Sequence, residues 1–344
     1  MPLRSVKALA VNLVVSLVTV FFLFLLIELT FRTIIFFENQ KSFAKLMRNL
    51  EQPENGIAKH LGQIIQPSRY PSIVYELRPN LSVYFRNAWT QTNKQGFRMG
   101  PLSLEKGKRT VRIVGLGDSH MFGWAVSQEE MYAKLLENIL NAKFPQKKWE
   151  FINTGVPGYN TFVEVETLSR KALIYKPDIV IYEFIANDFD VPFFLLEAPD
   201  CLSFKRSFFI DFLKNKLKEE AVRIIQEPMK LDGMPEDDIR KIPERYRYMF
   251  GMQAFLKSMI KLKKMQERNH FEVVICFSQS PWPQPFDALV ALCQRLGFHV
   301  LIDVQNDPSL ISDGHPTAVG HKLKAEAISE FMSSEKIIDK YLSV

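Results

Sequence analysis

The chain reads VRIVGLGDS at residues 111–119, and this short run indicates the architecture of the domain around it. Residues 111–116 are apolar and rich in β-branched side chains, which is typical of a buried strand. The run then ends in Gly117, Asp118 and Ser119, which favour a turn. A polar turn directly after a buried strand predicts that the Ser119 hydroxyl lies at the carboxyl edge of a sheet.

Strand-like and helix-like segments alternate from this run onward. Strands are predicted at 111–116, 149–152, 178–184, 271–277 and 298–302, and helices at 129–143, 162–175, 286–296 and 318–332. This alternation predicts an α/β fold, with helices on both faces of a doubly wound, parallel, five-stranded sheet. Ligands of such sheets bind beyond the carboxyl ends of the strands.

The amino-terminal segment has a different composition. Residues 8–27 contain no charged side chain and are dominated by Val, Leu and Phe. As a helix, this run extends about 30 Å, the thickness of the hydrocarbon core of a bilayer. A cleavable signal peptide has a shorter apolar stretch and then a small-residue cleavage site, which residues 28–32 do not offer. We therefore predict an uncleaved, single-pass transmembrane anchor over residues 1–37, with membrane lipid as its partner.

Positive charges flank this anchor on both sides. Arg4 and Lys7 precede it, and Lys41 and Lys45 follow it, so the positive-inside rule does not favour a translocated carboxyl-terminal domain. Long domains translocate largely regardless of flanking charge.

Three further segments follow the anchor. We interpret residues 38–104 as a juxtamembrane linker with a small strand-containing segment, including a short strand near 82–85. Residues 105–335 form the predicted α/β domain. Residues 192–250 interrupt its rhythm and read as an insertion between the third and fourth strands, where it could act as a lid.

The composition is that of an ordinary globular protein, with 47% apolar and 24% charged residues. The formal charge of +6 could favour anionic surfaces or could be solvated surface lysine. The sequence has neither a basic tract interleaved with aromatics nor zinc-finger spacing, so we expect no nucleic-acid partner. Its three cysteines are far apart, so we expect neither a disulfide framework nor a zinc site.

Two more strands are followed by residues that could donate hydrogen bonds, a glycine after one and an asparagine after the other. Residues 153–160 follow the second predicted strand, and the N–H of Gly158 could donate to a developing oxyanion. Asn187 follows the third predicted strand and could donate its side-chain amide to the same oxyanion. Each feature taken alone is equally well a turn or a helix cap.

A histidine with a nearby carboxylate lies close to the carboxyl terminus. Of the six histidines, His315 alone has a carboxylate two positions away in a Gly/Pro loop, at Asp313. A serine is a weak nucleophile unless a base takes its proton. A histidine base in turn needs an orienting partner on its other ring nitrogen, which Asp313 could supply. The pattern predicts that Ser119 and His315 meet at the sheet edge.

The order of these motifs resembles the four blocks of the SGNH (GDSL) hydrolase superfamily over about residues 105–335. The matching residues are Gly117-Asp118-Ser119, Gly158, Asn187-Asp188, and Asp313 with His315. The resemblance implies a flavodoxin-like three-layer fold, with Ser119 as nucleophile, His315 as base and Asp313 completing a triad. It also implies an oxyanion hole made by the N–H groups of Ser119 and Gly158 and the side chain of Asn187.

Two departures from the family pattern bear on the reaction. Many members have Asp-x-x-His where this chain has Asp313-Gly314-His315, a spacing similar to that of the alginate-type O-acetyltransferase branch. The third block lacks the usual leading glycine but keeps Asn187. The upstream run NKQGFR at 93–98 also resembles membrane-anchored bacterial SGNH proteins, which implies a periplasmic or other extracytoplasmic catalytic domain.

These patterns leave three functions open. The first is an esterase or deacylase, in which water resolves an acyl-enzyme. The second is an O-acyltransferase, in which a hydroxyl of a cell-envelope glycan resolves it. The third is a catalytically inactive, anchored scaffold or binding protein. The expected substrate is an ester-bearing small molecule, lipid or glycan, and no metal or organic cofactor is implied.

Overall fold

A computed structural model describes residues 3–50, 53–197, 200–214, 223–225, 242–278, 286–303 and 310–342. These residues fall into two compact units, which we describe separately. The first comprises Met1–Leu50 with Leu196–Ile225, and the second comprises Glu51–Leu195 with Gln226–Val344.

The second unit is built on a five-stranded parallel sheet with the strand order β12-β11-β8-β6-β7. The strands are β6 Thr110–Leu116, β7 Lys148–Asn153, β8 Ile179–Phe184, β11 Glu272–Ser278 and β12 His299–Asp303. In chain order this is the 2-1-3-4-5 arrangement of doubly wound, flavodoxin-like sheets. The predicted α/β fold with five parallel strands is therefore confirmed.

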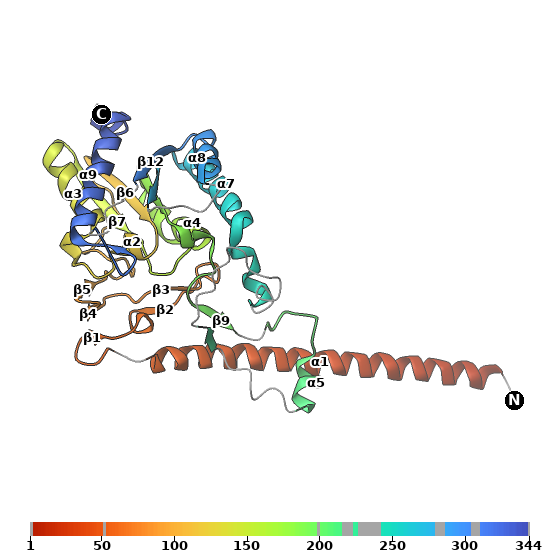
Figure 1. Cartoon of the computed structure of the whole chain (residues 1–344). Helices are drawn as coiled ribbons and strands as arrows, with labels where there is room; N and C mark the ends of the chain where they lie inside the picture. Colours follow the sequence, from red (N-terminus) through yellow and green to blue (C-terminus); the bar gives the residue numbers. More distant parts are fainter. Residues whose placement is uncertain are drawn as a thin grey trace. The chain divides into compact units, whose positions relative to one another are not determined.

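Helices cover both faces of this sheet (Figure 1). One face carries α3 Tyr132–Lys143 and α9 Ala318–Ser334, and the other carries α4 Thr161–Thr167, α7 Gly251–Asn269 and α8 Phe286–Arg295. Alternate residues of a strand point to opposite faces. In β6, Val111 and Ile113 pack in the core under α3 and α9, whereas Val114 and Leu116 pack in the core under α4, α7 and α8.

The predicted helices are present with altered ends. The helix expected at 162–175 begins as α4, continues as a π-helical turn at Leu168–Ala172 and ends as a 3-10 turn at Leu173–Tyr175. α7 is a helix of 19 residues that was not among the predicted elements. The remaining short elements of this unit are η1 Leu61–Gln63, α2 Ser119–Phe122, η2 Gln128–Glu130, η5 Ala186–Phe189, η6 Glu244–Met249, β13 Ile311–Ser312, β14 His315–Pro316 and α10 Asp339–Leu342.

Residues 53–104 add two small sheets to the second unit. One consists of β1 Ile57–Ala58, β4 Ser82–Phe85 and β5 Ala88–Gln91, and the other of β2 Ile65–Pro67 and β3 Tyr75–Leu77. The short strand expected near 82–85 is thus present. Ile64, Ile65 and Phe85 are buried, so this part of the predicted linker and strand-containing segment is folded.

The first unit is dominated by α1, a helix of 47 residues over Leu3–Asn49. Among the described residues it is the one helix long and apolar enough to cross a membrane, and none of its apolar window is buried. The helix does not end at residue 37 but runs on through the first part of the predicted linker.

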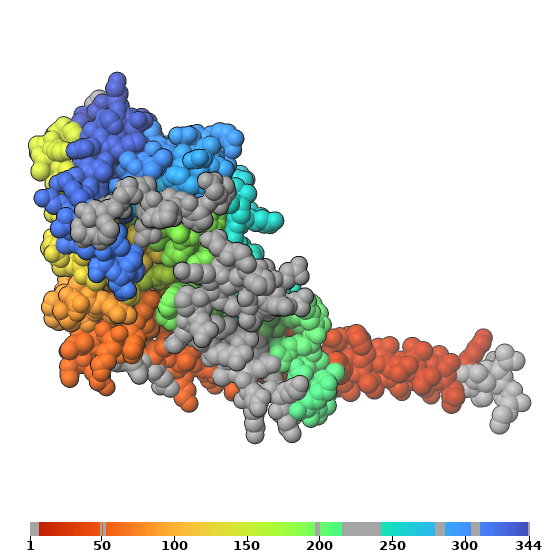
Figure 2. All heavy atoms as spheres, viewed as in Figure 1, coloured from red at the N-terminus to blue at the C-terminus, as the bar shows by residue number. Residues whose placement is uncertain are grey.

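The predicted insertion covers residues 192–250, and its part Leu196–Ile225 also belongs to the first unit. Its short helix α5 Phe208–Leu213 packs on α1, as Figure 2 shows by the light-green atoms against the red ones. The same unit holds β10 Arg223–Ile225 and residues 196–197 of β9 Leu195–Glu197, the strand with which β10 pairs. Residues 198–199, 215–222 and 226–241 of the predicted lid lie outside the described residues.

Candidate active site

The strand order brings two of the sequence motifs, Gly117-Asp118-Ser119 and Asn187-Asp188, to one edge of the sheet. β6 pairs with β7 on one side and with β8 on the other. The chain leaves β6 toward β7 and later returns to β8 on the opposite side of β6, so the loops after β6 and β8 diverge. Such a switch point is where doubly wound sheets bind their ligands. Ser119 follows β6 and Asn187 follows β8, so both lie at this point.

Ser119 is the first residue of the four-residue helix α2. Asp118 caps this helix, because its Oδ1 accepts a hydrogen bond of 3.0 Å from the N–H of His120. Gly123 ends it in the left-handed conformation, with a φ of 84°. This tight strand-to-helix turn fixes the Ser119 hydroxyl at the sheet edge, where the residue is 7% exposed.

His315 reaches Ser119 from a β-hairpin. β13 and β14 pair so that Ser312 faces His315, which leaves Asp313 and Gly314 as the two turn residues. Both have a positive φ, 52° and 73°, as a type I′ turn requires, and Asp-Gly is a favoured pair in such turns. The hairpin places His315 Nε2 at 2.8 Å from Ser119 Oγ.

The Asp313 carboxylate does not make the contact that the sequence suggests. His315 Nδ1 lies 2.7 Å from the backbone carbonyl oxygen of Asp313, and Asp313 itself is exposed. A carbonyl oxygen can only accept a hydrogen bond, so Nδ1 carries the proton. Nε2 of the neutral ring is then the nitrogen that can accept the proton of Ser119. The backbone of the turn, rather than a carboxylate, orients the ring.

Asp118 joins Ser119 to Asn187. Its Oδ2 accepts hydrogen bonds from Ser119 Oγ at 3.1 Å and from Asn187 Nδ2 at 2.9 Å. The Ser119 hydroxyl has a single proton, so Asp118 and His315 compete for it in this state. An amide nitrogen carries two hydrogens, so the bond from Asn187 leaves a second one for an oxyanion. The sequence analysis assigned no separate role to Asp118.

Gly158 lies in the loop between β7 and α4. Its φ of 77° suits glycine, and a Cβ at this position would collide with the side chain of Phe193. Nearby, Val156 donates its N–H to the carbonyl oxygen of Gly117 at 3.3 Å, which ties the loop to the turn before Ser119. Within the described part of the chain no hydrogen bond joins Gly158 to Ser119, so its oxyanion role stays a prediction.

His120 supports the hairpin that carries His315. Its Nε2 lies 3.1 Å from the carbonyl oxygen of Gly314, and its Nδ1 lies 3.7 Å from Glu183 Oε1. Glu183 also pairs with Lys324, and all three side chains are buried. Burial alone would raise the pKa of Glu183, but the charges and hydrogen bonds of Lys324 and His120 outweigh it and lower that pKa. The sequence analysis had set His120 aside.

The surroundings of His315 favour its neutral form. Burial lowers the pKa of His315, and the neighbouring His120 lowers it further. The Asp313 carbonyl and the carboxylates of Asp118 and Asp313 act in the opposite direction without reversing the shift. The form of His315 that can accept a proton therefore predominates at a lower pH than for an ordinary histidine.

Trp124 and Arg98 complete the surroundings of the site. The Trp124 ring stacks on His315, with 5.1 Å between ring centroids and 21° between planes. Arg98, the last residue of the NKQGFR run, donates to the carbonyl oxygens of Phe122 and Val126, each at 2.8 Å. Burial lowers the pKa of Arg98 to about 9, so it stays charged at neutral pH. The sequence analysis noted the NKQGFR run only for its resemblance and did not predict this contact.

No family model and no curated protein matches the chain. Solved structures that resemble it include a protein of Desulfitobacterium hafniense assigned to the lipolytic G-D-S-L family, with 15% identity over 64% of this chain and 99% of that chain and a TM-score of 0.40. A lipase/acylhydrolase of Enterococcus faecalis has 18% identity over 65% of this chain and 96% of that chain, with a TM-score of 0.38. A psychrotrophic esterase of Pseudoalteromonas has 15% identity over 65% of this chain and 97% of that chain, with a TM-score of 0.38.

These identities and TM-scores are low, so the fold and the site described above rest on the strand order and the contacts of this chain. The first of these neighbours bears the name of the G-D-S-L family, which is the family that the four sequence motifs resemble.

Proposed function

We propose that this protein is an acyl-ester hydrolase in which Ser119 is the nucleophile and His315 is the general base. The observation that carries the proposal is the distance of 2.8 Å between His315 Nε2 and Ser119 Oγ. The contact of Nδ1 with the Asp313 carbonyl supports it, because it leaves Nε2 free of a proton. A nucleophile and its base need this proximity, with the base oriented by a third group.

In the proposed reaction, Ser119 Oγ attacks the ester carbonyl carbon while His315 Nε2 takes the hydroxyl proton. The oxyanion receives hydrogen bonds from the Ser119 N–H and from Asn187 Nδ2, with the Gly158 N–H as a third donor. His315 returns the proton to the departing alcohol, which leaves an acyl-enzyme. Water, deprotonated by His315, then attacks the acyl carbon. The bond to Ser119 Oγ breaks, His315 returns the proton to that oxygen, and the acid is released.

The imidazolium that forms in each step has two neighbours that suit it. The Asp313 carbonyl fixes the ring orientation, although a neutral oxygen stabilises the cation less than a carboxylate does. The face of Trp124, stacked on the ring, adds a cation–π contribution of about 0.5–2 kcal/mol.

We also propose that α1 anchors the protein in a membrane as a single span, with the second unit on the extracytoplasmic side. The support for the span is the uncharged run 8–27, and the support for the side is the sequence resemblance alone. Protease added to spheroplasts, in which any outer membrane has been opened, should remove an epitope placed after Val344. Protection of that epitope until the inner membrane is lysed would place the unit in the cytoplasm.

The hydrolase is tested with the full chain in detergent, using p-nitrophenyl esters of increasing acyl length. We expect Ser119→Ala and His315→Ala to lower kcat by roughly 10³-fold or more, and Asn187→Ala by about 10²–10³-fold. Ser334→Ala, an exposed serine at the end of α9, serves as the matched control and should be unchanged. Ester hydrolysis at the wild-type rate by Ser119→Ala would refute the proposal.

The same assay separates the alternatives. Free acid as the product is expected for a hydrolase, whereas acylation of an added glycan with little free acid would identify an acyltransferase. A fluorophosphonate probe should label the wild type at Ser119 but not the His315→Ala variant. Failure of the wild type to label or to turn over any ester would favour the inactive scaffold.

A further inference from the structure

The apolar run of α1 ends in a charged pair. Glu28 and Arg32, one helical turn apart, form an ion pair of 2.8 Å directly after residues 8–27. Glu28 is only 8% exposed. The pair is covered by residues 201–213, which we call the docked segment.

The pair satisfies main-chain groups of the docked segment. The Glu28 carboxylate accepts hydrogen bonds from the N–H groups of Phe208 and Phe209, both at 3.1 Å, and from the Ser207 hydroxyl at 2.7 Å. Arg32 donates to the carbonyl oxygens of Cys201 at 2.6 Å, Ser203 at 2.9 Å and Arg206 at 3.0 Å. An acid and a base of α1 thus supply partners for five main-chain groups that lie more than 160 residues away in sequence.

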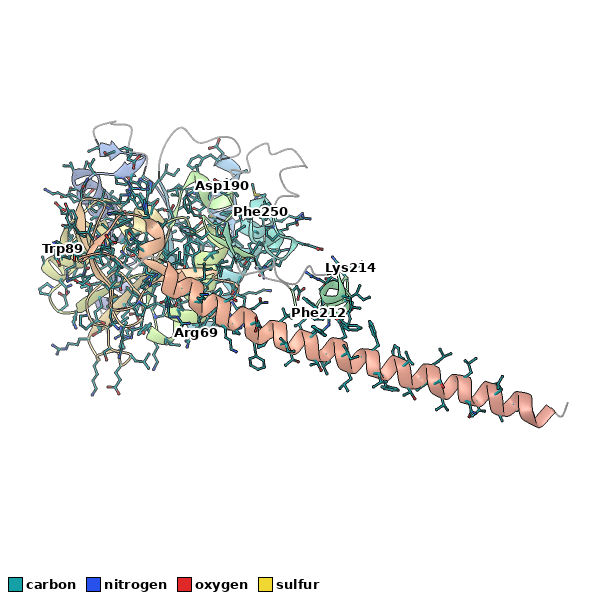
Figure 3. The ribbon with its side chains drawn as sticks, turned by 90° about the horizontal axis from the view of Figure 1, so that it is seen from below. Arg69, Trp89, Asp190, Phe212, Lys214 and Phe250 are labelled. Atoms are coloured by element: carbon teal, nitrogen blue, oxygen red, sulfur yellow. The ribbon has the colours of Figure 1, made fainter. Side chains whose placement is uncertain are left out.

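Aromatic contacts fix the level of the docked segment along α1. The Phe209 ring lies 5.8 Å from Phe24 and 5.7 Å from Phe31, and the Phe212 ring lies 4.8 Å from Phe31. Figure 3 labels Phe212 on the short helix beside α1. At about 1.5 Å per residue, Phe24 lies about 5 Å inside the end of the apolar run at Ile27. Amphipathic segments at a bilayer surface bury their apolar face about 5–10 Å deep.

The docked segment presents further apolar side chains outward. Leu202 is 85% exposed, Phe204 98% and Leu213 64%. Such a cluster on a short segment is costly in water and typical of a contact surface. Lys205 and Lys214, which are also exposed, carry the charge that anionic lipid headgroups attract.

We propose that the docked segment is a second membrane contact, which inserts Leu202, Phe204 and Leu213 into the headgroup–acyl boundary of the bilayer that α1 spans. Non-helical backbone is tolerated at that depth only when protein groups satisfy it, and Glu28 with Arg32 does so here. The level set by Phe24 and the flanking lysines favour a lipid surface over a protein partner. The proposal rests on the proposed anchoring by α1 and is independent of the proposed catalysis.

The test uses the full chain with Cys201→Ser. The other two cysteines, Cys276 and Cys293, are buried and should not react with the dye. A polarity-sensitive dye is attached at Phe204→Cys or at Leu17→Cys, and the protein is reconstituted into vesicles of phosphatidylcholine and phosphatidylglycerol. Lipids that carry a nitroxide near the headgroup should quench the dye at position 204, and lipids that carry it near the bilayer centre should quench the dye at position 17. A dye–cysteine conjugate in solution gives the aqueous value.

The outcomes separate the two proposals. Quenching at 17 with aqueous behaviour at 204 overturns the second contact and leaves the anchor. Absence of lipid quenching at 17 overturns the anchor itself. A dye at 204 that emits as in an apolar environment but escapes lipid quenching lies against protein, for example a second copy, and also overturns the membrane contact.

A variant pair tests the role of the buried acid. Glu28→Ala should lower lipid quenching at 204 by about twofold or more, because the docked segment loses its partner, while quenching at 17 is retained. Glu38→Ala, which removes an exposed acid from the same helix, is the matched control and should leave both signals unchanged. Equal quenching at 204 in the Glu28→Ala and Glu38→Ala variants overturns the assignment of Glu28.

Discussion

Asp313 acts on His315 through its main chain, and this gives the first prediction at the scale of single residues. When a triad carboxylate is replaced by an amide, kcat falls by about 10⁴-fold. Here Asp313→Asn should keep kcat/KM within about threefold of the wild type, since asparagine also adopts the positive φ of a type I′ turn. Steady-state kinetics of ester hydrolysis measure this, with His315→Ala as the inactive reference. A loss of 10³-fold or more in Asp313→Asn would return the orienting role to the carboxylate.

The pKa of His315 sets the acid limb of the proposed reaction. The neutral ring is the active base, and because its pKa is lowered, the neutral form persists below the ordinary value of about 6.5. We expect kcat/KM to rise with pH and to reach half its plateau below that value. His120→Gln removes the neighbour that lowers the pKa of His315 and should move the limb upward, whereas His60→Gln, at an exposed histidine, should not. A wild-type midpoint above about 6.5 would contradict the expected shift.

Sequence reasoning could predict that Ser119, Asn187 and His315 lie near one another, because each lies in a motif just beyond a strand or in a short loop. The contributions of Asp118 and Trp124 depend on which atoms face one another, and this is decided by tertiary packing. The use of a carbonyl at Asp313 follows from a backbone turn rather than from a side-chain type. The pair Asp313-Gly314 is typical of such a turn, but the sequence analysis used it only to suggest that His315 is a base.

At the scale of elements, Arg98 holds the turn after α2 in place. Its guanidinium donates to three carbonyl oxygens of this turn, at Phe122, Gly123 and Val126, and to a fourth at Trp89. Each buried group left without a partner costs about 1–3 kcal/mol, so Arg98→Ala should lower the free energy of unfolding by about 3 kcal/mol or more. Denaturant unfolding measures the loss, and kcat/KM should fall with it as α2 loosens.

Two further variants make this prediction specific. Arg98→Lys should recover less than half of the loss, because a single ammonium cannot span the three carbonyls. Arg268→Ala, an exposed arginine of α7, is the matched control. Equal stability of the Arg98→Ala and Arg268→Ala variants would show that Arg98 is not needed to hold the turn.

The five strands were predictable to within about two residues because buried parallel strands are short apolar runs between turns. α7 was missed although Phe255, Met259 and Leu262 stand at helical spacing, because lysines between them dilute the apolar signal. The continuation of α1 to Asn49 was also missed. A helix can continue past the end of its apolar run with polar side chains. The change in composition after residue 27 therefore does not mark the end of α1.

At the scale of the whole molecule, the chain divides into two units whose boundaries cross the insertion. The sequence suggested an anchor, a linker and one interrupted domain, whereas Leu196–Ile225 belongs with α1. This division could not be predicted, because the bonds from Glu28 and Arg32 to residues near 200 link positions far apart in sequence.

The division predicts how the chain can be shortened. Removal of residues 1–50 alone should cause aggregation, because Phe209 and Phe212 lose their partners on α1. Removal of residues 1–50 together with replacement of 196–225 by a Gly/Ser linker should give a monomer whose kcat/KM lies within about threefold of the full chain. Size-exclusion chromatography and ester hydrolysis measure the two properties. An inactive but folded monomer would show that the first unit contributes to catalysis.

The ion pair of Glu28 and Arg32 also has a consequence for the timing of synthesis. At about 5–20 residues per second, the ribosome completes residues 201–213 roughly 10–30 s after α1. During that interval the two charges stand at the end of the proposed membrane span without the main-chain groups that later surround them. The contact between them spans a single helical turn, so it can form as soon as α1 does. Glu28 and Arg32 can thus neutralise each other until residues 201–213 are made and bind to them.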